Sequence, residues 1–132
     1  MTNLHINLKE IVTGIGSFDI TQQSPRVIDA GGTARFTVQF YHQKDGPVAP
    51  AGLTASIYQG VISTTRLLLA TLTPLPDVYG VGSFFVDFPV PLTQGAGPVY
   101  CEWSGMYTSS DNPTPEPVLI RSYTRVVQPA RD

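Results

Sequence analysis

The feature that most constrains this chain of 132 residues is a succession of short segments in which apolar and polar side chains alternate. The two clearest segments are residues 34–40 and 99–103. Alternation with a period of two places every second side chain on one face of a β-strand. Prolines and glycines, twelve of each, gather between the segments and indicate turns. The pattern predicts an all-β fold, a single β-sandwich of about seven or eight antiparallel strands.

The alternating segments define where we expect strands. The expected ranges are residues 15–20, 33–41, 53–59, 65–72, 79–88, 99–107 and 118–127. Residues 4–8 also alternate, and they form either an eighth strand or an arm that becomes ordered on a partner. Residues 61–72 could be read as a helix, but their threonines favour a strand. We therefore expect an N-terminal strand or arm segment over residues 1–30 and a sandwich domain over residues 31–132.

The phase of the alternation predicts which side chains face the core and which segments lie outside the sheets. Three segments rich in proline and glycine, residues 45–52, 89–98 and 109–117, are expected to be loops. Ser122 and Thr124 interrupt the inward face of the last strand. The expected core consists of Ala34, Phe36, Val38, Phe40, Leu53, Ala55, Ile57, Phe84, Val86, Phe88, Val99, Cys101, Trp103, Val118, Ile120 and Val126.

Composition and charge exclude several classes of function. The net charge is −2 and the basic residues are scattered, so the basic stripe of a nucleic-acid-binding protein is absent. The chain shows neither a secretory signal nor an apolar run of transmembrane length, so we expect synthesis in the cytoplasm and no membrane partner. Charged residues make up only 14% and apolar residues 42%, which suggests that neighbouring subunits cover part of the surface.

No pattern typical of catalysis or of a bound cofactor is present. Metal-binding residues are too far apart to form a closed zinc site, and we expect His42 to be a surface loop histidine. Cys101 lies on the core phase, where a cysteine acts as a small apolar residue. Asp87 and Glu102 both point outward and could face each other across a sheet, as a glycosidase requires, but a solvated outer face is the commoner arrangement. We therefore expect no catalytic, cofactor-binding or metal-binding residues.

Carbohydrate binding is the main alternative to assembly. Sugar-binding β-sandwiches use exposed aromatic side chains, and five tyrosines are candidates for exposure. Their spacing does not predict a flat platform. A cluster of exposed tyrosines at one end of the sandwich would favour this alternative over assembly, and Tyr107 would then be needed for binding. The five candidates are Tyr41, Tyr58, Tyr79, Tyr100 and Tyr107.

Five stretches of the sequence resemble a known family when they are taken in order. They are residues 33–40 followed by 45–47, residues 53–58, residues 77–89, and residues 97–105. Together they resemble the immunoglobulin-like sandwich of virion structural proteins from tailed bacteriophages. The resemblance covers roughly residues 30–128, and it lacks the paired cysteines of antibody domains. A jelly roll with strands at similar spacing stays open as an alternative topology.

The resemblance implies a non-enzymatic structural protein of a virion. It would be a small capsid decoration (cement) protein or a tail or baseplate component, made in the host cytoplasm. Its partners would be other capsid or tail proteins and copies of itself, as a trimer or hexamer. A host-surface or carbohydrate-binding module is the alternative. The expected interface residues are Leu4, Ile6 and Leu8 in the N-terminal segment, together with Phe85, Tyr107, Pro113 and Pro115.

Overall fold

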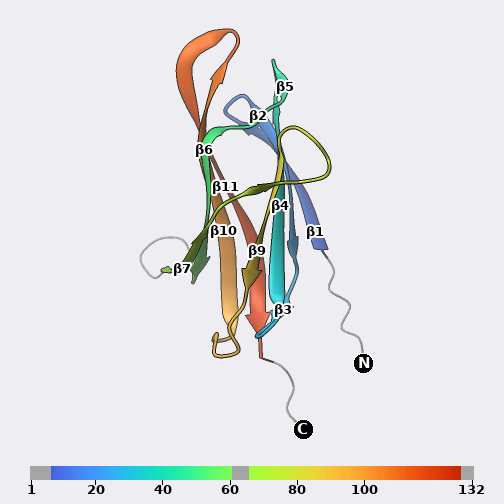
Figure 1. Cartoon of the computed structure of the whole chain (residues 1–132), viewed down its shortest axis with the longest axis vertical. Coiled ribbons are helices and arrows are strands. Elements are labelled where there is room, and N and C mark those ends of the chain that lie inside the picture. Colours follow the sequence, from blue (N-terminus) through green and yellow to red (C-terminus); the bar gives the residue numbers. More distant parts are fainter. Residues whose placement is uncertain (1–6, 61–65, 129–132) are drawn as a thin grey trace.

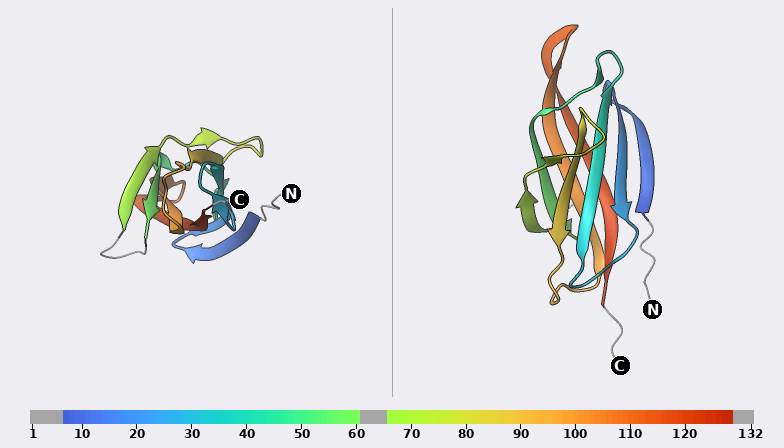
Figure 2. Two further views of the ribbon diagram at one scale, coloured as in Figure 1. Left: turned by 90° about the horizontal axis from the view of Figure 1, so that it is seen from below. Right: turned by 45° about the vertical axis from the view of Figure 1, so that its right-hand side comes forward.

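The computed structural model describes residues 7–60 and 66–128, and it is all-β in these ranges. Two sheets pack face to face and form an elongated sandwich (Figure 1). Seen along its long axis, the strands surround a single filled interior (Figure 2). The prediction of an all-β protein built from two sheets is confirmed. No helix in the described ranges is long and apolar enough to cross a bilayer.

The first sheet, called sheet A below, has the strand order β1-β2-β4-β9-β8, and β5 pairs with the end of β4. All of its pairings are antiparallel. Its strands are β1 (Asn7–Ile15), β2 (Phe18–Pro25), β4 (Thr33–His42), β5 (Gly46–Pro47), β8 (Leu75–Pro76) and β9 (Ser83–Pro89).

The second sheet, called sheet B, has the strand order β3-β11-β10-β6-β7. Its long strands are antiparallel, while the short β3 runs parallel to the end of β11. The strands are β3 (Ile28–Asp29), β6 (Ala51–Gln59), β7 (Leu67–Leu72), β10 (Gly97–Ser109) and β11 (Asn112–Val127). The β10–β11 hairpin projects beyond the other strands at one end of the sandwich (Figure 1).

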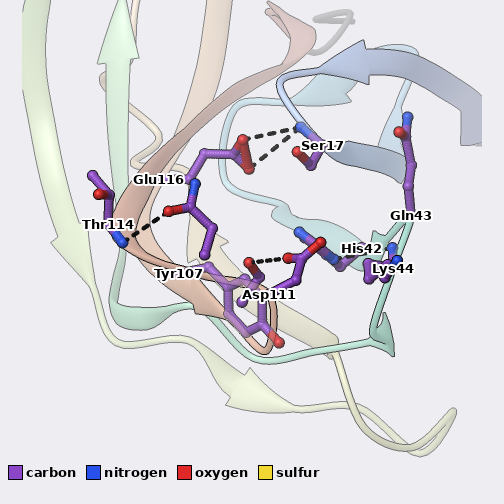
Figure 3. A pocket seen from close by; sticks show the side chains of 10 residues that line it. Ser17, His42, Gln43, Lys44, Tyr107, Asp111, Thr114 and Glu116 are labelled. Carbon is purple, nitrogen blue, oxygen red and sulfur yellow. Dashed lines mark hydrogen bonds between the residues drawn. The ribbon is translucent and has the colours of Figure 1, made fainter.

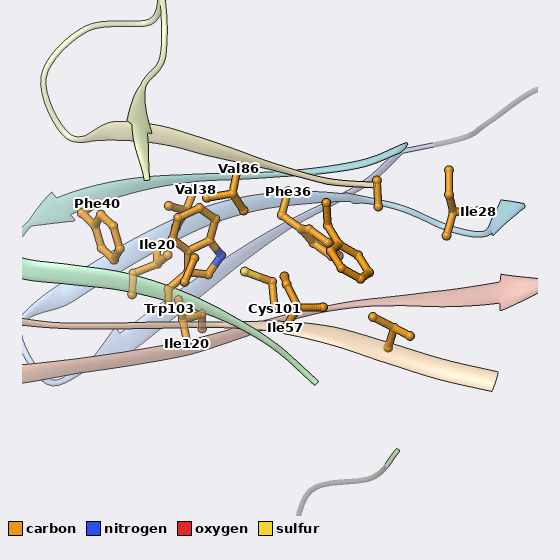
Figure 4. Close-up of a cluster of buried hydrophobic side chains, with 14 of the residues drawn as sticks. Ile20, Ile28, Phe36, Val38, Phe40, Ile57, Val86, Cys101, Trp103 and Ile120 are labelled. Carbon is orange, nitrogen blue, oxygen red and sulfur yellow. The ribbon is translucent and has the colours of Figure 1, made fainter. Parts of the chain in front are cut away.

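The core lies between the sheets and follows the predicted phase. Figure 4 shows Phe36, Phe40 and Val86 from sheet A pointing toward Ile57 and Trp103 from sheet B. Fourteen of the sixteen predicted core residues are buried, and Leu53 and Phe84 are half-buried at its margin. The alternation was a reliable guide because each strand has one face toward the opposite sheet, so a shift by one residue would expose the whole apolar set.

The inward phase of β11 continues through Ser122 and Thr124, which are both buried polar residues. The Ser122 hydroxyl donates a 2.5 Å hydrogen bond to the carboxamide oxygen of Gln22, a buried residue of β2. The face therefore continues through polar side chains. A buried hydroxyl is tolerated where a partner on the opposite sheet accepts its hydrogen bond.

The prediction of a loop over residues 109–117 is also wrong for most of that range. Strand β11 begins at Asn112, and Glu116 and Pro117 stand opposite Tyr107 and Met106 of β10. Proline cannot donate to a ladder, and this half of β11 pairs with β10 alone. The prolines can therefore occupy strand positions whose nitrogen faces away from β10.

The N-terminal region contributes to both sheets. Strand β1 pairs with β2 of the same chain from Asn7 to Ile15, with a bulge between Val12 and Ile15. Gly14 in this bulge has a positive φ of 73°, as expected for a bulge glycine. Residues 1–6 lie outside the described residues, and the proposed division at residue 30 stays a prediction.

Candidate interaction surfaces

One end of the sandwich is fixed by the carboxylate of Asp45, which lies in the turn between β4 and β5. Asp45 accepts a 2.6 Å hydrogen bond from the Tyr107 hydroxyl and bonds from the backbone and hydroxyl of Ser110, at 3.0 and 2.5 Å. These donors lower the pKa of Asp45 to about 2. The same contact raises the pKa of Tyr107 to about 12. Asp45 thus joins sheet A to the β10–β11 hairpin of sheet B.

His42 is buried beside this contact, so its predicted place on a surface loop is wrong. Its ring packs at right angles to Phe18, with centroids 5.2 Å apart, and lies 5.1 Å from the Tyr107 ring. Its Nδ1 accepts hydrogen bonds from the backbone N–H groups of Lys44 and Asp45, both at 3.1 Å. The imidazole therefore shapes the turn that presents Asp45.

A cleft of about 330 Å³ opens between this turn, the β1–β2 turn and the hairpin (Figure 3). Glu116 crosses one side of it and accepts bonds from the backbone N–H of Ser17 at 3.1 and 3.3 Å. Asp111 accepts a 2.8 Å bond from the hydroxyl of Ser109. Glu116 thus joins the hairpin to the β1–β2 turn, whereas the Asp111 bond lies within the hairpin.

The residues expected for metal binding or acid–base chemistry do not come together in the described part of the chain in the ways considered above. The described residues contain no group of three or more side chains of the types that hold a metal ion. Asp87 lies on β9 of sheet A and Glu102 on β10 of sheet B, so the idea that they face each other is wrong. Burial raises the pKa of the Cys101 thiol far above its ordinary value, which keeps it protonated.

Three tyrosines form a row across the outer face of sheet B. Tyr100 on β10 stands directly opposite Tyr58 on β6 and Tyr123 on β11. Both pairs of ring centroids are 5.4 Å apart. Leu68 on the edge strand β7, itself 52% exposed, pairs with Tyr58 and extends the row. The register of β7, β6, β10 and β11 places these four side chains next to one another.

Arginines surround this tyrosine row. The Arg66 guanidinium lies 4.2 Å from the ring centroid of Tyr58, and its Nη1 is 3.3 Å from Glu102. Arg121 donates a 2.9 Å bond to the same carboxylate. Arg125, exposed on the outward phase of β11, adds a third positive charge to this face. Among the described residues, the carboxylates on the same face are Glu102 and Asp29, which pairs with the outward Val127.

The tyrosine row does not form a platform for sugars. Tyr58 and Tyr100 stack with an interplanar angle of 26°, so their ring faces are turned toward each other. Tyr100 is fully buried in the row, and its predicted exposure is wrong. Tyr107 is half-buried and bonded to Asp45, whereas Tyr41 and Tyr79 are exposed as expected. Sugars stack on free ring faces, and of the row only Tyr123 at its end is exposed.

Of the predicted interface residues that the structure describes, Phe85 lies on sheet A, whereas Tyr107, Pro113 and Pro115 lie on the β10–β11 hairpin. Phe85 points outward from β9, half-buried, with the Arg35 guanidinium 4.3 Å from its ring centroid. Tyr107 lies at the tied end of the sandwich. Leu4 and Ile6 lie outside the described residues. Leu8 lies in β1 opposite Ser24, and its side chain is not among the parts that the structure describes.

Pro113 and Pro115 are exposed on the projecting half of β11. Their spacing of two places both on the outward face of sheet B. Both also lack the N–H that would face an incoming strand, so this edge is protected against strand addition. Contacts through the proline rings remain open to a partner.

No protein-family model matches the chain, and no curated protein shows significant similarity to it.

Proposed function

We propose that this chain is a non-enzymatic structural protein of a virion, a decoration or tail component that acts by binding copies of itself and neighbouring virion proteins. The observation that carries the proposal is the outer face of sheet B. Tyr123, Leu119 and Met106 are between 42% and 48% exposed on this face, next to Arg121 and Arg125. Tyrosine, methionine and arginine are enriched in protein–protein interfaces, where they supply most of the binding energy.

The order of the strands supports an immunoglobulin-like form of the sandwich. In such domains one sheet carries strands A, B, E and D, and the other carries G, F and C, with an added C′ strand in variable types. Taken in chain order, β2, β4, β6 and β7 fit A, B, C and C′, and β8 to β11 fit D to G. Both sheet orders then agree with the immunoglobulin-like pattern, which favours it over a jelly roll.

Light scattering on the purified chain tests self-association, with co-sedimentation on virion particles from the same source as the second readout. We expect a trimer or hexamer, or particle binding where the shell drives assembly. The double variant Leu119→Ser, Tyr123→Ser should lose both self-association and particle binding. The matched control is Tyr41→Ser, which removes a tyrosine of similar exposure from sheet A. A wild-type chain that stays monomeric and does not sediment with particles contradicts the proposal.

A nested pair of deletions tests the N-terminal segment as a latch on a neighbour. Strand addition by residues 1–6 would leave the β1–β2 ladder intact, since that ladder begins at Asn7. Deleting residues 1–6 should therefore weaken assembly without changing thermal stability. Deleting residues 1–12 should also destabilise the fold, because it removes most of the β1 ladder. Unchanged assembly after the shorter deletion would exclude the latch.

A further inference from the structure

A groove on the outer face of sheet A, distant from the tyrosine row, has the features of a ligand site. It encloses about 420 Å³, which lies within the range of small-ligand sites. Its floor consists of two cross-strand pairs between β2 and β4, Thr21 with Gln39 and Gln23 with Thr37. None of these four side chains has a hydrogen-bond partner among the described residues. Two hydroxyls and two carboxamides are therefore free to meet a ligand.

The wall of the groove is the turn between β8 and β9, which reaches across toward β4 (Figure 1). The turn is closed by its own backbone hydrogen bonds, from Asp77 N to Ser83 O, Gly80 N to Asp77 O and Ser83 N to Gly80 O. The Gly82 carbonyl accepts a 2.9 Å bond from Phe40 N and joins the turn to β4. A wall held in this way loses little conformational entropy when a ligand binds.

The wall presents apolar side chains to solvent at its rim. Tyr79 is 79% exposed and lines the groove, and Val78 beside it is 90% exposed. Neither ring face of Tyr79 packs on another aromatic or cationic side chain of the described residues. A large exposed aromatic above a floor of hydroxyls and amides is costly in water and offers both an apolar face and directed hydrogen bonds.

A further polar group beside the groove also lacks a partner. Ser83 lies where the turn meets β9, and it is only 3% exposed. Its Oγ has no hydrogen bond within the described part of the chain. A buried hydroxyl without a partner costs about 1–3 kcal/mol relative to a satisfied one.

The charges of the groove argue against an anionic ligand. Its charged lining groups are Arg35 and Asp77. Arg35 is already held by two bonds to Asp87, at 2.7 and 2.8 Å, and Asp77 accepts a 2.7 Å bond from Val78 N. No free cation is therefore left to select an anion. Recognition must then come from hydroxyl and carboxamide groups.

The floor also argues against a peptide ligand. Strands β2, β4 and β9 are interior strands of sheet A, and each is paired on both sides. A peptide binding by strand addition needs an open edge with free backbone groups, which these strands do not have. A sugar does not need backbone partners, because its hydroxyls both donate and accept and its C–H faces stack on an aromatic ring.

We propose that this groove binds a neutral oligosaccharide, with one sugar ring stacked on Tyr79 and its hydroxyls bonded to Gln39 and Gln23. The proposal goes beyond the assembly function and is independent of it, since the groove and the tyrosine row lie on opposite sheets. A virion component with such a groove could hold a glycan without using the surface that binds its neighbours.

The test is binding of the full chain to immobilised neutral hexose and N-acetylhexosamine oligomers, followed by titration with the best soluble oligomer. Tyr79→Ala and Gln39→Leu should each weaken binding about tenfold. Tyr41→Ala is the matched control, because it removes a tyrosine of the same sheet face that does not line the groove. Thermal melting of each variant separates lost binding from lost folding.

Side-chain amide resonances give a second readout that needs no variant. The NMR signals of the Gln23 and Gln39 carboxamides should shift during the titration, while those of Gln94, outside the groove, should stay in place. No saturable binding across the oligomers overturns the proposal. So does binding that Tyr79→Ala leaves unchanged in a folded variant, because the sugar would then occupy another surface.

Discussion

The hydrogen bond between Ser122 and Gln22 joins the two sheets through the core, and its removal should follow the rule for buried polar pairs. Ser122 is 1% exposed and Gln22 is 6% exposed. The Gln22 carboxamide also donates a 2.8 Å bond to Glu10, which fixes its orientation because a carboxylate only accepts. The carboxamide oxygen therefore faces Ser122, and the hydroxyl is its donor.

The magnitude follows from what each substitution leaves behind. Ser122→Ala leaves the carboxamide oxygen of Gln22 buried in the core without a donor, and it should cost about 1–3 kcal/mol of unfolding free energy. Gln22→Leu leaves the buried Ser122 hydroxyl without an acceptor and should lower the unfolding free energy by a similar amount. The double variant removes both polar groups and should lie within about 1 kcal/mol of the wild type. The coupling between the two sites, the sum of the single losses minus the loss in the double variant, should thus be at least about 1 kcal/mol.

Urea denaturation of the four proteins measures this coupling, and thermal melting gives a second estimate at about 4 °C per kcal/mol for a chain of this size. Ser104→Ala is the control, since Ser104 is half-buried on the outer face of β10 and should change stability by less than about 0.5 kcal/mol. If the loss in the double variant equals the sum of the single losses, the two side chains are not coupled and the reasoning fails.

Three further predictions concern the thiol, the tied end and a turn glycine. Because Cys101 is buried and its pKa is raised, it should react with a thiol reagent only after unfolding, and rapid reaction of the native chain would contradict its burial. Asp45 has its pKa lowered from 3.8 to about 2, so its contribution to stability is present above pH 3.8 and is lost as the pH falls toward 2. The pKa of Tyr107 is raised from 10.0 to about 12, so its contribution is present below pH 10.0 and is lost as the pH rises toward 12. Denaturation at several pH values should show a loss of stability at low pH and another at high pH. Asp45→Asn should remove the loss at low pH. Gly82→Ala should destabilise the fold by about 2 kcal/mol or more, because φ is +84° and the new Cβ would lie 2.8 Å from the Phe40 carbonyl oxygen. Gly80→Ala, with φ +101° and open space around it, should cost less, and equal melting temperatures would refute the steric argument.

The sequence was most informative where one residue's environment depends on its own strand. The inward positions of β4, such as Phe36 and Phe40, followed from alternation alone, because the pleat sends every second side chain to the same face. The positive φ of Gly14 in the β1 bulge also fits a local rule, since few other residues accept this conformation. Strand ends were less certain at proline-rich segments, where the absence of a donor is compatible with an edge strand as well as with a loop.

The candidate sites could not be predicted from the sequence, because they depend on the register between strands that are far apart in the chain. His42 was mistaken for a surface residue since its burial comes from Phe18 and Tyr107, which reach it only in the folded sandwich. The groove on sheet A likewise combines residues of β2 and β4 with a turn some forty residues further on. No local pattern marks such a meeting, and no spacing rule could have paired Tyr79 with Gln39.

The alternation of side chains by itself determined that the protein is all-β and which side chains of the recognised strands face the core, because these properties are set by neighbours along the strand. Only the tertiary structure decided that Tyr58, Tyr100 and Tyr123 stand in one row, and that Asp87 and Glu102 lie on opposite sheets. The physical reason is that a strand's period specifies the face of a side chain, whereas the pairing of strands specifies what lies beside it.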